Sequence, residues 1–173
     1  MQQNRPSVLY IHGFDSSPMA EKTSIIADLG YTVIAPKIHY KESKNTYQRL
    51  LHLAQEFNIE FIVGSSLGGY TAFWLSQELN VPTLLFNPSL AFQKIDPGLV
   101  HQNLSIINTR QSIFLGMKDE TVHPTTTIDW LKMNQIFEKV EIIEDPNNGH
   151  QISLSVFKQQ MKMLLEELVP QEA

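Results

Sequence analysis

Two kinds of hydrophobic pattern alternate along the chain. Short runs of Val, Ile, Leu and Phe recur between longer stretches in which apolar residues return every three or four positions. Short continuous runs are typical of strands that are buried on both faces, because neither face then has to meet water. Six runs predict strands, at residues 8–11, 32–35, 60–63, 83–86, 112–115 and 140–143.

The longer stretches predict five helices, each with its apolar residues on one face. In the first of them, Ser17 followed by Pro18 is typical of an N-cap and the first helical residue, and Gly30 is typical of a C-terminal stop. The expected helices span residues 18–30, 47–57, 67–79, 126–137 and 151–168.

Strands that alternate with helices predict an α/β fold, here a three-layer αβα sandwich around a mostly parallel sheet of about six strands. The chain has 173 residues, the usual size of one domain, so residues 1–173 are expected to form a single domain. The weakly patterned segment 87–111, between the fourth and fifth strands, is expected to hold irregular loop and a short helix. It is too short for a large lid, so we expect an open, shallow cleft.

Composition removes several classes of function. Hydrophobic residues make up 42% of the chain and charged residues 18%, which is typical of a globular protein. The net charge is -5 without any basic run, so nucleic acid is not an expected partner. The absence of cysteine excludes disulfides, thiolate zinc sites and a cysteine nucleophile. The first apolar run is too short for a signal sequence or a membrane span, so we expect a cytoplasmic protein with no membrane partner.

The strongest chemical signal is Gly64-Ser65-Ser66-Leu67-Gly68, which matches Gly-x-Ser-x-Gly. This motif places a serine at the tip of a tight strand-to-helix turn, and the glycines on either side leave room for that turn. The spacing selects Ser66, and the expected strand before it and helix after it supply the required context. The alternatives are a glycine-rich turn without chemistry and a phosphate site at the helix N-terminus, although no Lys-Ser/Thr pair follows.

A nucleophilic serine needs a neighbouring base, and the chain holds six histidines. His52 is expected on the polar face of a helix, His39 and His101 lie in loops without a partner motif, and His12 is expected to support the loop after the first strand. His123 and His150 remain as candidates. His150 follows the last expected strand, where folds of this kind carry the base after the serine and the acid. The spacing therefore favours His150.

The acid that orients such a histidine is expected at the end of an earlier strand. Asp119 follows the fifth strand and is the favoured candidate, with Glu120 as its neighbour. Asp145, one strand later, is the rival, and its other interpretation is a cap for the turn before Pro146.

An oxyanion hole requires two backbone N–H groups that point at the developing negative charge. Leu67, directly after Ser66, is expected to supply one of them. Gly13 allows close approach in the loop after the first strand, so Phe14 is expected to supply the other. The loops at the same sheet edge also contain residues expected to line the pocket: Asn87, Pro88 and His123.

These motifs together resemble those of the YqiA/YcfP-like small esterases of bacteria. The resemblance is carried by residues 9–18 (LYIHGFDSSP), 62–70 (IVGSSLGGY) and 86–88 (FNP), and then by the regions around Asp119 and His150. It implies a shortened, lidless α/β-hydrolase fold that hydrolyses carboxylic ester or thioester bonds. It also implies Ser66 as nucleophile, Asp119 as acid and His150 as base.

The expected function is therefore a serine hydrolase that transfers a small acyl group to water and needs neither a metal nor a cofactor. Its expected partner is a small acyl ester or thioester. One alternative is a catalytically silent module that binds a small ligand or a partner in the same cleft. A second alternative is a peptidase or amidase on the same fold, since no residue in the chain indicates which leaving group the enzyme accepts.

Overall fold

A computed structural model describes residues 5–93, 95–99 and 107–168 of the chain. All six predicted strands are present in it, with ends that differ from the predictions by two residues at most. They are β1 (Ser7–Ile11), β2 (Thr32–Ile34), β3 (Phe61–Ser65), β4 (Thr83–Phe86), β5 (Gln111–Gly116) and β6 (Glu141–Asp145).

The strands form one sheet in the order β2-β1-β3-β4-β5-β6. Every neighbouring pair is parallel, with register pairs such as Leu9 with Ile62 and Gly64 with Leu85. Parallel neighbours need crossover connections, and helices supply those that follow β1, β2, β3 and β5. The predicted α/β class and the parallel sheet are confirmed.

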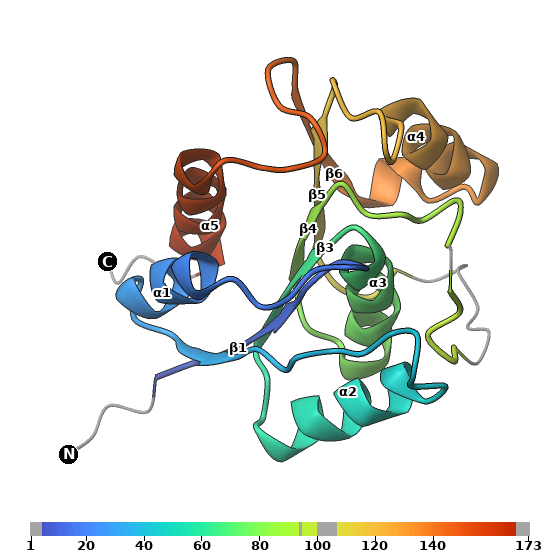
Figure 1. Ribbon diagram of the computed structural model, residues 1–173. Coiled ribbons are helices and arrows are strands. Elements are labelled where there is room, and N and C mark those ends of the chain that lie inside the picture. Colours follow the sequence, from blue (N-terminus) through green and yellow to red (C-terminus); the bar gives the residue numbers. More distant parts are fainter. Residues whose placement is uncertain (1–4, 94, 100–106, 169–173) are drawn as a thin grey trace.

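Helices cover both faces of this sheet (Figure 1). On one face lie α1 (Ala20–Asp28) and α5 (Leu154–Leu168), which pack against each other. The other face carries α2 (Thr46–Glu56), α3 (Leu67–Leu79) and α4 (Pro124–Met133). The result is the three-layer αβα sandwich that the alternation of patterns predicts.

The core consists of two apolar layers, one on each side of the sheet. Successive residues of β1 point alternately into the two layers. Leu9 and Ile11 belong to the layer under α2 and α3, while Val8 and Tyr10 belong to the layer under α1 and α5. Side chains alternate between the two faces of a strand, so a strand buried on both faces has to be apolar throughout.

The predicted start of the first helix is wrong. Helix α1 begins at Ala20 with Met19 in an extended conformation as its N-cap, so Ser17 caps nothing and Pro18 lies outside the helix. The chain turns at Asp15, whose φ is 53°, and uses the following residues to travel from β1 to the layer of α5. The predicted end is confirmed, since Gly30 adopts a left-handed φ of 95° after the last turn.

Helix α2 differs from its expected range by one residue at each end, and two other helices differ by more. Helix α4 begins at Pro124 instead of residue 126 and ends at Met133, because Gln135 has a left-handed φ of 57° that reverses the chain. A short 3-10 helix, η1 (Phe137–Lys139), follows it. Helix α5 begins at Leu154, three residues after the predicted start, because residues 151–153 still belong to the loop that follows β6.

The segment between β4 and β5 contains no helix or strand in its described residues, 87–93, 95–99 and 107–110. The expected short helix is therefore absent from them. Residues 94 and 100–106, on which the expectation of a lidless cleft also depends, lie outside the described residues.

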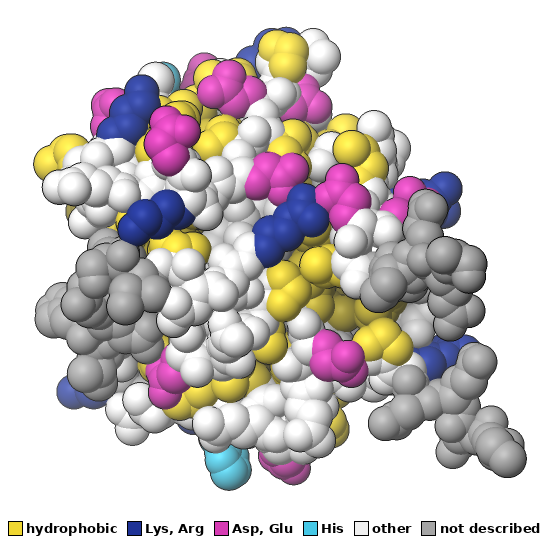
Figure 2. All heavy atoms as spheres, turned by 180° about the vertical axis from the view of Figure 1, so that it is seen from behind, with side chains coloured by type: hydrophobic (Ala, Val, Ile, Leu, Met, Phe, Trp, Pro, Cys, Tyr) yellow, Lys and Arg dark blue, Asp and Glu magenta, His cyan; other side chains and the backbone are white. Residues whose placement is uncertain are grey.

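The surface carries charges of both signs. On the face shown in Figure 2, Lys and Arg side chains of the described residues lie among Asp and Glu side chains. Arg110, for example, pairs with both Glu141 and Glu167. Within the described residues, no helix is long and apolar enough to cross a lipid bilayer.

Candidate active site

Ser66 occupies a strained turn between β3 and α3. Its φ of 55° and ψ of -119° lie in a region that non-glycine residues rarely adopt, and such strain is concentrated at functional turns. The turn is held by backbone bonds: the Ser66 amide donates to Phe86, and its carbonyl accepts from Tyr70 and Ser89. The hydroxyl-bearing Cβ is therefore fixed at the carboxyl edge of the sheet.

Close packing explains the glycines of the motif. A Cβ on Gly68 would lie 2.2 Å from the Ile11 carbonyl oxygen, and one on Gly64 would lie 2.6 Å from the Gly68 carbonyl oxygen. These neighbours are backbone atoms and cannot rotate away. The glycines therefore let α3 begin directly against β1, which brings Ser66 beside the loop that follows β1.

His150 and Asp119 are joined by a hydrogen bond. The distance between His150 Nδ1 and Asp119 Oδ2 is 2.8 Å. The Asp119 side chain is fully buried, whereas 27% of the His150 side chain is exposed. The other carboxylate oxygen, Oδ1, accepts from the amides of Thr121 and Val122, each at 2.8 Å. The carboxylate is thus held from one side and presented to the imidazole on the other.

Asp145, the alternative acid, has a different contact. Its Oδ1 accepts from the amides of Asn147 and Asn148 at 2.7 and 3.2 Å, so it caps the turn after β6. Glu120 lies at the cavity wall. Of the three acidic candidates, Asp119 is the one that contacts His150.

A cavity of about 520 Å³ lies at this edge of the sheet and is lined by both Ser66 and His150. A volume of this size is typical of small-molecule sites. Its other lining residues are Phe14, Asp15, Leu67, Ser89, Ala91, Phe92, Glu120, Thr121, Val122, His123 and Thr126. The sequence pattern does not predict Ser89, Phe92 or Val122 at the site, because they lie in stretches without periodicity or motif.

Both expected oxyanion donors also line this cavity. The described residues contain no acceptor that takes a hydrogen bond from the Phe14 or the Leu67 amide. Gly13 packs against the nucleophile turn, since a Cβ there would lie 3.1 Å from Ser66 Cβ. The loop after β1 therefore runs directly beside Ser66.

The buried side chain of His12 holds this loop in place through hydrogen bonds at both ring nitrogens. Its Nε2 accepts a hydrogen bond from the Ile38 amide at 2.9 Å, so the ring proton is on Nδ1, which donates to the Gly13 carbonyl at 2.8 Å. Tyr40 adds a bond from its hydroxyl to the His12 carbonyl at 2.7 Å. Burial lowers the pKa of His12, and the charges of His39 and Lys37 lower it further, against the opposing effect of the Gly13 carbonyl. The ring is thus held neutral as a structural support.

The expectation that Asn87 and Pro88 line the pocket is wrong. Both are buried, and the cavity wall at this position is formed by Ser89 instead. Asn87 has a left-handed φ of 45°, and its side chain bonds to Gly116, Gly149 and His150. It therefore connects these loops and does not line the cavity.

His123 lines the cavity as expected and lies at the N-cap position of α4. The ring is exposed, and Nδ1 lies 2.9 Å from the Thr125 hydroxyl.

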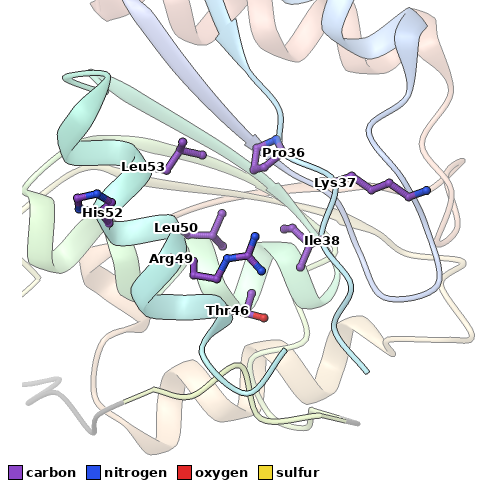
Figure 3. A pocket seen from close by; sticks show the side chains of 8 residues that line it. All are labelled: Pro36, Lys37, Ile38, Thr46, Arg49, Leu50, His52 and Leu53. Atoms are coloured by element: carbon purple, nitrogen blue, oxygen red, sulfur yellow. The ribbon is translucent and has the colours of Figure 1, made fainter. Parts of the chain in front are cut away.

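A second, smaller cavity of about 250 Å³ lies between α2 and the chain after β2 (Figure 3). None of the predicted catalytic residues lines it. Its walls are Pro36, Lys37, Ile38, Thr46, Arg49, Leu50, His52 and Leu53. His52 is exposed there, on the outer side of α2. Among the described residues, no cluster of three or more His, Asp or Glu side chains is suited to hold a metal ion.

The sequence pattern of the family described as "Uncharacterised protein family (UPF0227)" matches residues 7–114, which include β1 to β4, the Ser66 turn and the first part of β5. The chain belongs to this family. UPF0227 is the YqiA/YcfP-like family, so the resemblance found in the motifs is confirmed.

Similar solved structures share the fold. A protein from Xanthomonas campestris pv. campestris, assigned to the alpha/beta superfamily of hydrolases, is 21% identical with a TM-score of 0.74, over 95% of this chain and 99% of its own. The esterase RhEst1 from Rhodococcus sp. ECU1013 is 10% identical with a TM-score of 0.73, over 95% and 92%. Est1E from Butyrivibrio proteoclasticus is 14% identical with a TM-score of 0.66, over 94% and 88%. This UPF0227 protein therefore has the α/β-hydrolase fold.

Proposed function

We propose that this protein is a serine hydrolase that cleaves esters of small acyl groups through Ser66, His150 and Asp119. The observation that carries the proposal is the shared cavity: Ser66, at a strained turn, and His150, bonded to the buried Asp119, line the same space. Its structural relatives include named esterases, which is consistent with this chemistry.

The bond to Asp119 determines which nitrogen of His150 acts as the base. An ionised carboxylate can only accept a hydrogen bond, so the ring proton is on Nδ1 and Nε2 carries the free lone pair. In the proposed reaction, Nε2 takes the hydroxyl proton of Ser66 as Oγ attacks the carbonyl carbon. Asp119 then stabilises the imidazolium that results.

The Phe14 and Leu67 amides are proposed to bind the oxyanion of the tetrahedral intermediate. Their freedom from protein acceptors among the described residues supports this role. Collapse of the intermediate breaks the bond to the leaving alcohol, which receives the proton from His150. Water then attacks the acyl-Ser66 ester with His150 again as base, and the carboxylic acid leaves. No cofactor is required for these steps.

The cavity walls suggest the kind of acyl group. Phe14, Ala91, Phe92 and Val122 offer apolar surface on which an alkyl chain can pack. A small ester with a short apolar acyl group fits these walls.

The test is labelling with a fluorophosphonate, which reacts with an activated serine. Wild type is expected to be labelled and to hydrolyse p-nitrophenyl acetate and butyrate, while Ser66→Ala loses both by several orders of magnitude. Ser65→Ala is the matched control, because the neighbouring serine lies at the end of β3 and should be dispensable. Labelling that persists in Ser66→Ala would refute the role of Ser66.

The silent binding module is the alternative outcome of the same experiment. A folded wild-type protein that neither reacts with the probe nor hydrolyses any ester would support it. The preference for the leaving group is determined separately, by comparing kcat/KM for an ester, a thioester and an anilide of the same acyl group. We expect the ester and the thioester to be cleaved and the anilide to be resistant, since its amine leaves less readily.

A further inference from the structure

The side chain of Asn87 connects the two loops that carry Asp119 and His150. Its Oδ1 accepts a hydrogen bond from the Gly116 amide at 2.8 Å. Its Nδ2 donates to the carbonyls of Gly149 at 2.9 Å and His150 at 3.1 Å. Gly116 in turn begins the turn that holds the acid, because the Asp119 amide donates to the Gly116 carbonyl at 3.0 Å.

From these contacts we propose that Asn87 is a positioning residue that sets the spacing between Asp119 and His150. The inference rests on the proposed function and extends it to a residue outside the cavity. Asn87 is 1% exposed and does not line the cavity, so it acts on the reaction only through the two residues that it positions.

The two loops pack closely against each other, so a shift of one of them displaces the other. The amides of Met117 and Lys118 donate across to Asp145 and Asn148 at 2.9 and 3.0 Å. A Cβ on Gly116 would lie only 2.5 Å from the Gly149 carbonyl oxygen. The Asn87 side-chain amide bonds to both of these loops, and one of its bonds goes to the His150 backbone itself.

The chemistry of the site selects asparagine. The site needs one acceptor and two donors on a short side chain, and its backbone needs a left-handed φ, which Asn tolerates. Aspartate has nearly the same shape but would direct a lone pair at two carbonyl oxygens. Glycine keeps the backbone conformation and loses every side-chain bond. These two residues therefore make the cleanest substitutions.

The kinetic test compares Asn87→Asp and Asn87→Gly with a matched control on the same strand. Thr83→Val is that control, since it removes a buried 2.6 Å hydrogen bond to Gln111 at the opposite end of β4. We expect kcat for p-nitrophenyl butyrate to fall about 10- to 100-fold in both Asn87 variants, because a misplaced catalytic group is costly. KM should change by less than about threefold, because the cavity wall is intact.

Stability is measured alongside by urea unfolding, and kcat is compared well below each midpoint. If Asn87→Asp does not fold, Asn87→Gly decides, since it introduces no buried charge. A kcat no lower than that of Thr83→Val would overturn the proposal, and so would a loss that appears in KM alone.

Hydrogen exchange tests the same idea without any need for catalysis. We expect the Met117 and Lys118 amides to exchange faster in the Asn87 variants than in Thr83→Val, because the loops that they join are released. Unchanged exchange would refute the positioning role. Failure of wild type to label at Ser66 would instead refute the proposed function, so the two failures can be told apart.

Discussion

His150 Nδ1 and Asp119 Oδ2 lie 2.8 Å apart, although 31 residues separate them in the chain. The carboxylate cannot turn away from the ring, because its second oxygen is held by the Thr121 and Val122 amides. This arrangement fixes the tautomer of His150, and it makes the consequence of changing Asp119 predictable.

Asp119→Asn should fold normally and lose most of its activity. The amide oxygen can still accept from Thr121 and Val122, so the NH₂ group then faces His150 Nδ1 and forces the ring proton onto Nε2. A histidine protonated there cannot act as the base, and we expect kcat for ester hydrolysis to fall by about 10³- to 10⁴-fold. Glu120→Gln, the adjacent change at the cavity wall, serves as control and should stay within about threefold of wild type. A loss below tenfold in Asp119→Asn would contradict the assignment.

Gly68→Ala should be strongly destabilising. The new methyl group would lie 2.2 Å from the Ile11 carbonyl oxygen and 2.4 Å from that of His12, so α3 would have to move away from β1. We expect a loss of about 3 kcal/mol in the free energy of unfolding, measured by urea denaturation. Gly30→Ala is the control: it meets no atom within 4 Å and costs only the strain of its left-handed φ, about 1 kcal/mol. Equal losses in the two variants would argue against the close approach of α3 and β1.

The neutral state of His12 should make the protein sensitive to acid. Because its pKa is lowered in the folded state, the unfolded chain binds a proton at a higher pH than the folded protein does. The free energy of unfolding should therefore fall as the pH drops below the ordinary histidine range. In His12→Gln the side-chain oxygen can still accept from Ile38 but does not titrate, so a smaller fall is expected. Urea unfolding of both proteins at pH 7 and pH 5 makes the comparison, and parallel pH profiles would contradict the prediction.

Phe92 should affect substrate length preference without affecting the chemical step. Its side chain lines the cavity and is 73% exposed, so a longer acyl chain can cover it. In Phe92→Ala we expect KM for p-nitrophenyl octanoate to rise about fivefold, the equivalent of about 1 kcal/mol of lost apolar contact. The acetate ester should be unaffected. Phe57→Ala, an exposed phenylalanine at the end of α2 and away from the cavity, is the matched control. A KM for the octanoate ester that is unchanged from wild type in Phe92→Ala would exclude this contact.

Much of the fold could be predicted because it follows from local pattern. Apolar runs indicated all six strands, and the helical period of α3 matched its observed bounds of Leu67–Leu79. Helix starts were less predictable. Ser17 and Pro18 are residue types that commonly begin a helix. The chain uses them instead to cross from β1 to the layer of α5, so α1 begins only at Ala20.

The layered architecture and the serine turn follow from the sequence alone, because both depend on residue type at short spacing. The contact between Asp119 and His150 and the bonds of Asn87 to both loops become visible only in the folded chain. Asp119 and Asp145 each follow an expected strand, and position along the chain favours Asp119 without excluding Asp145. Their contacts depend on how β4, β5 and β6 align, and this alignment comes from packing across the whole sheet.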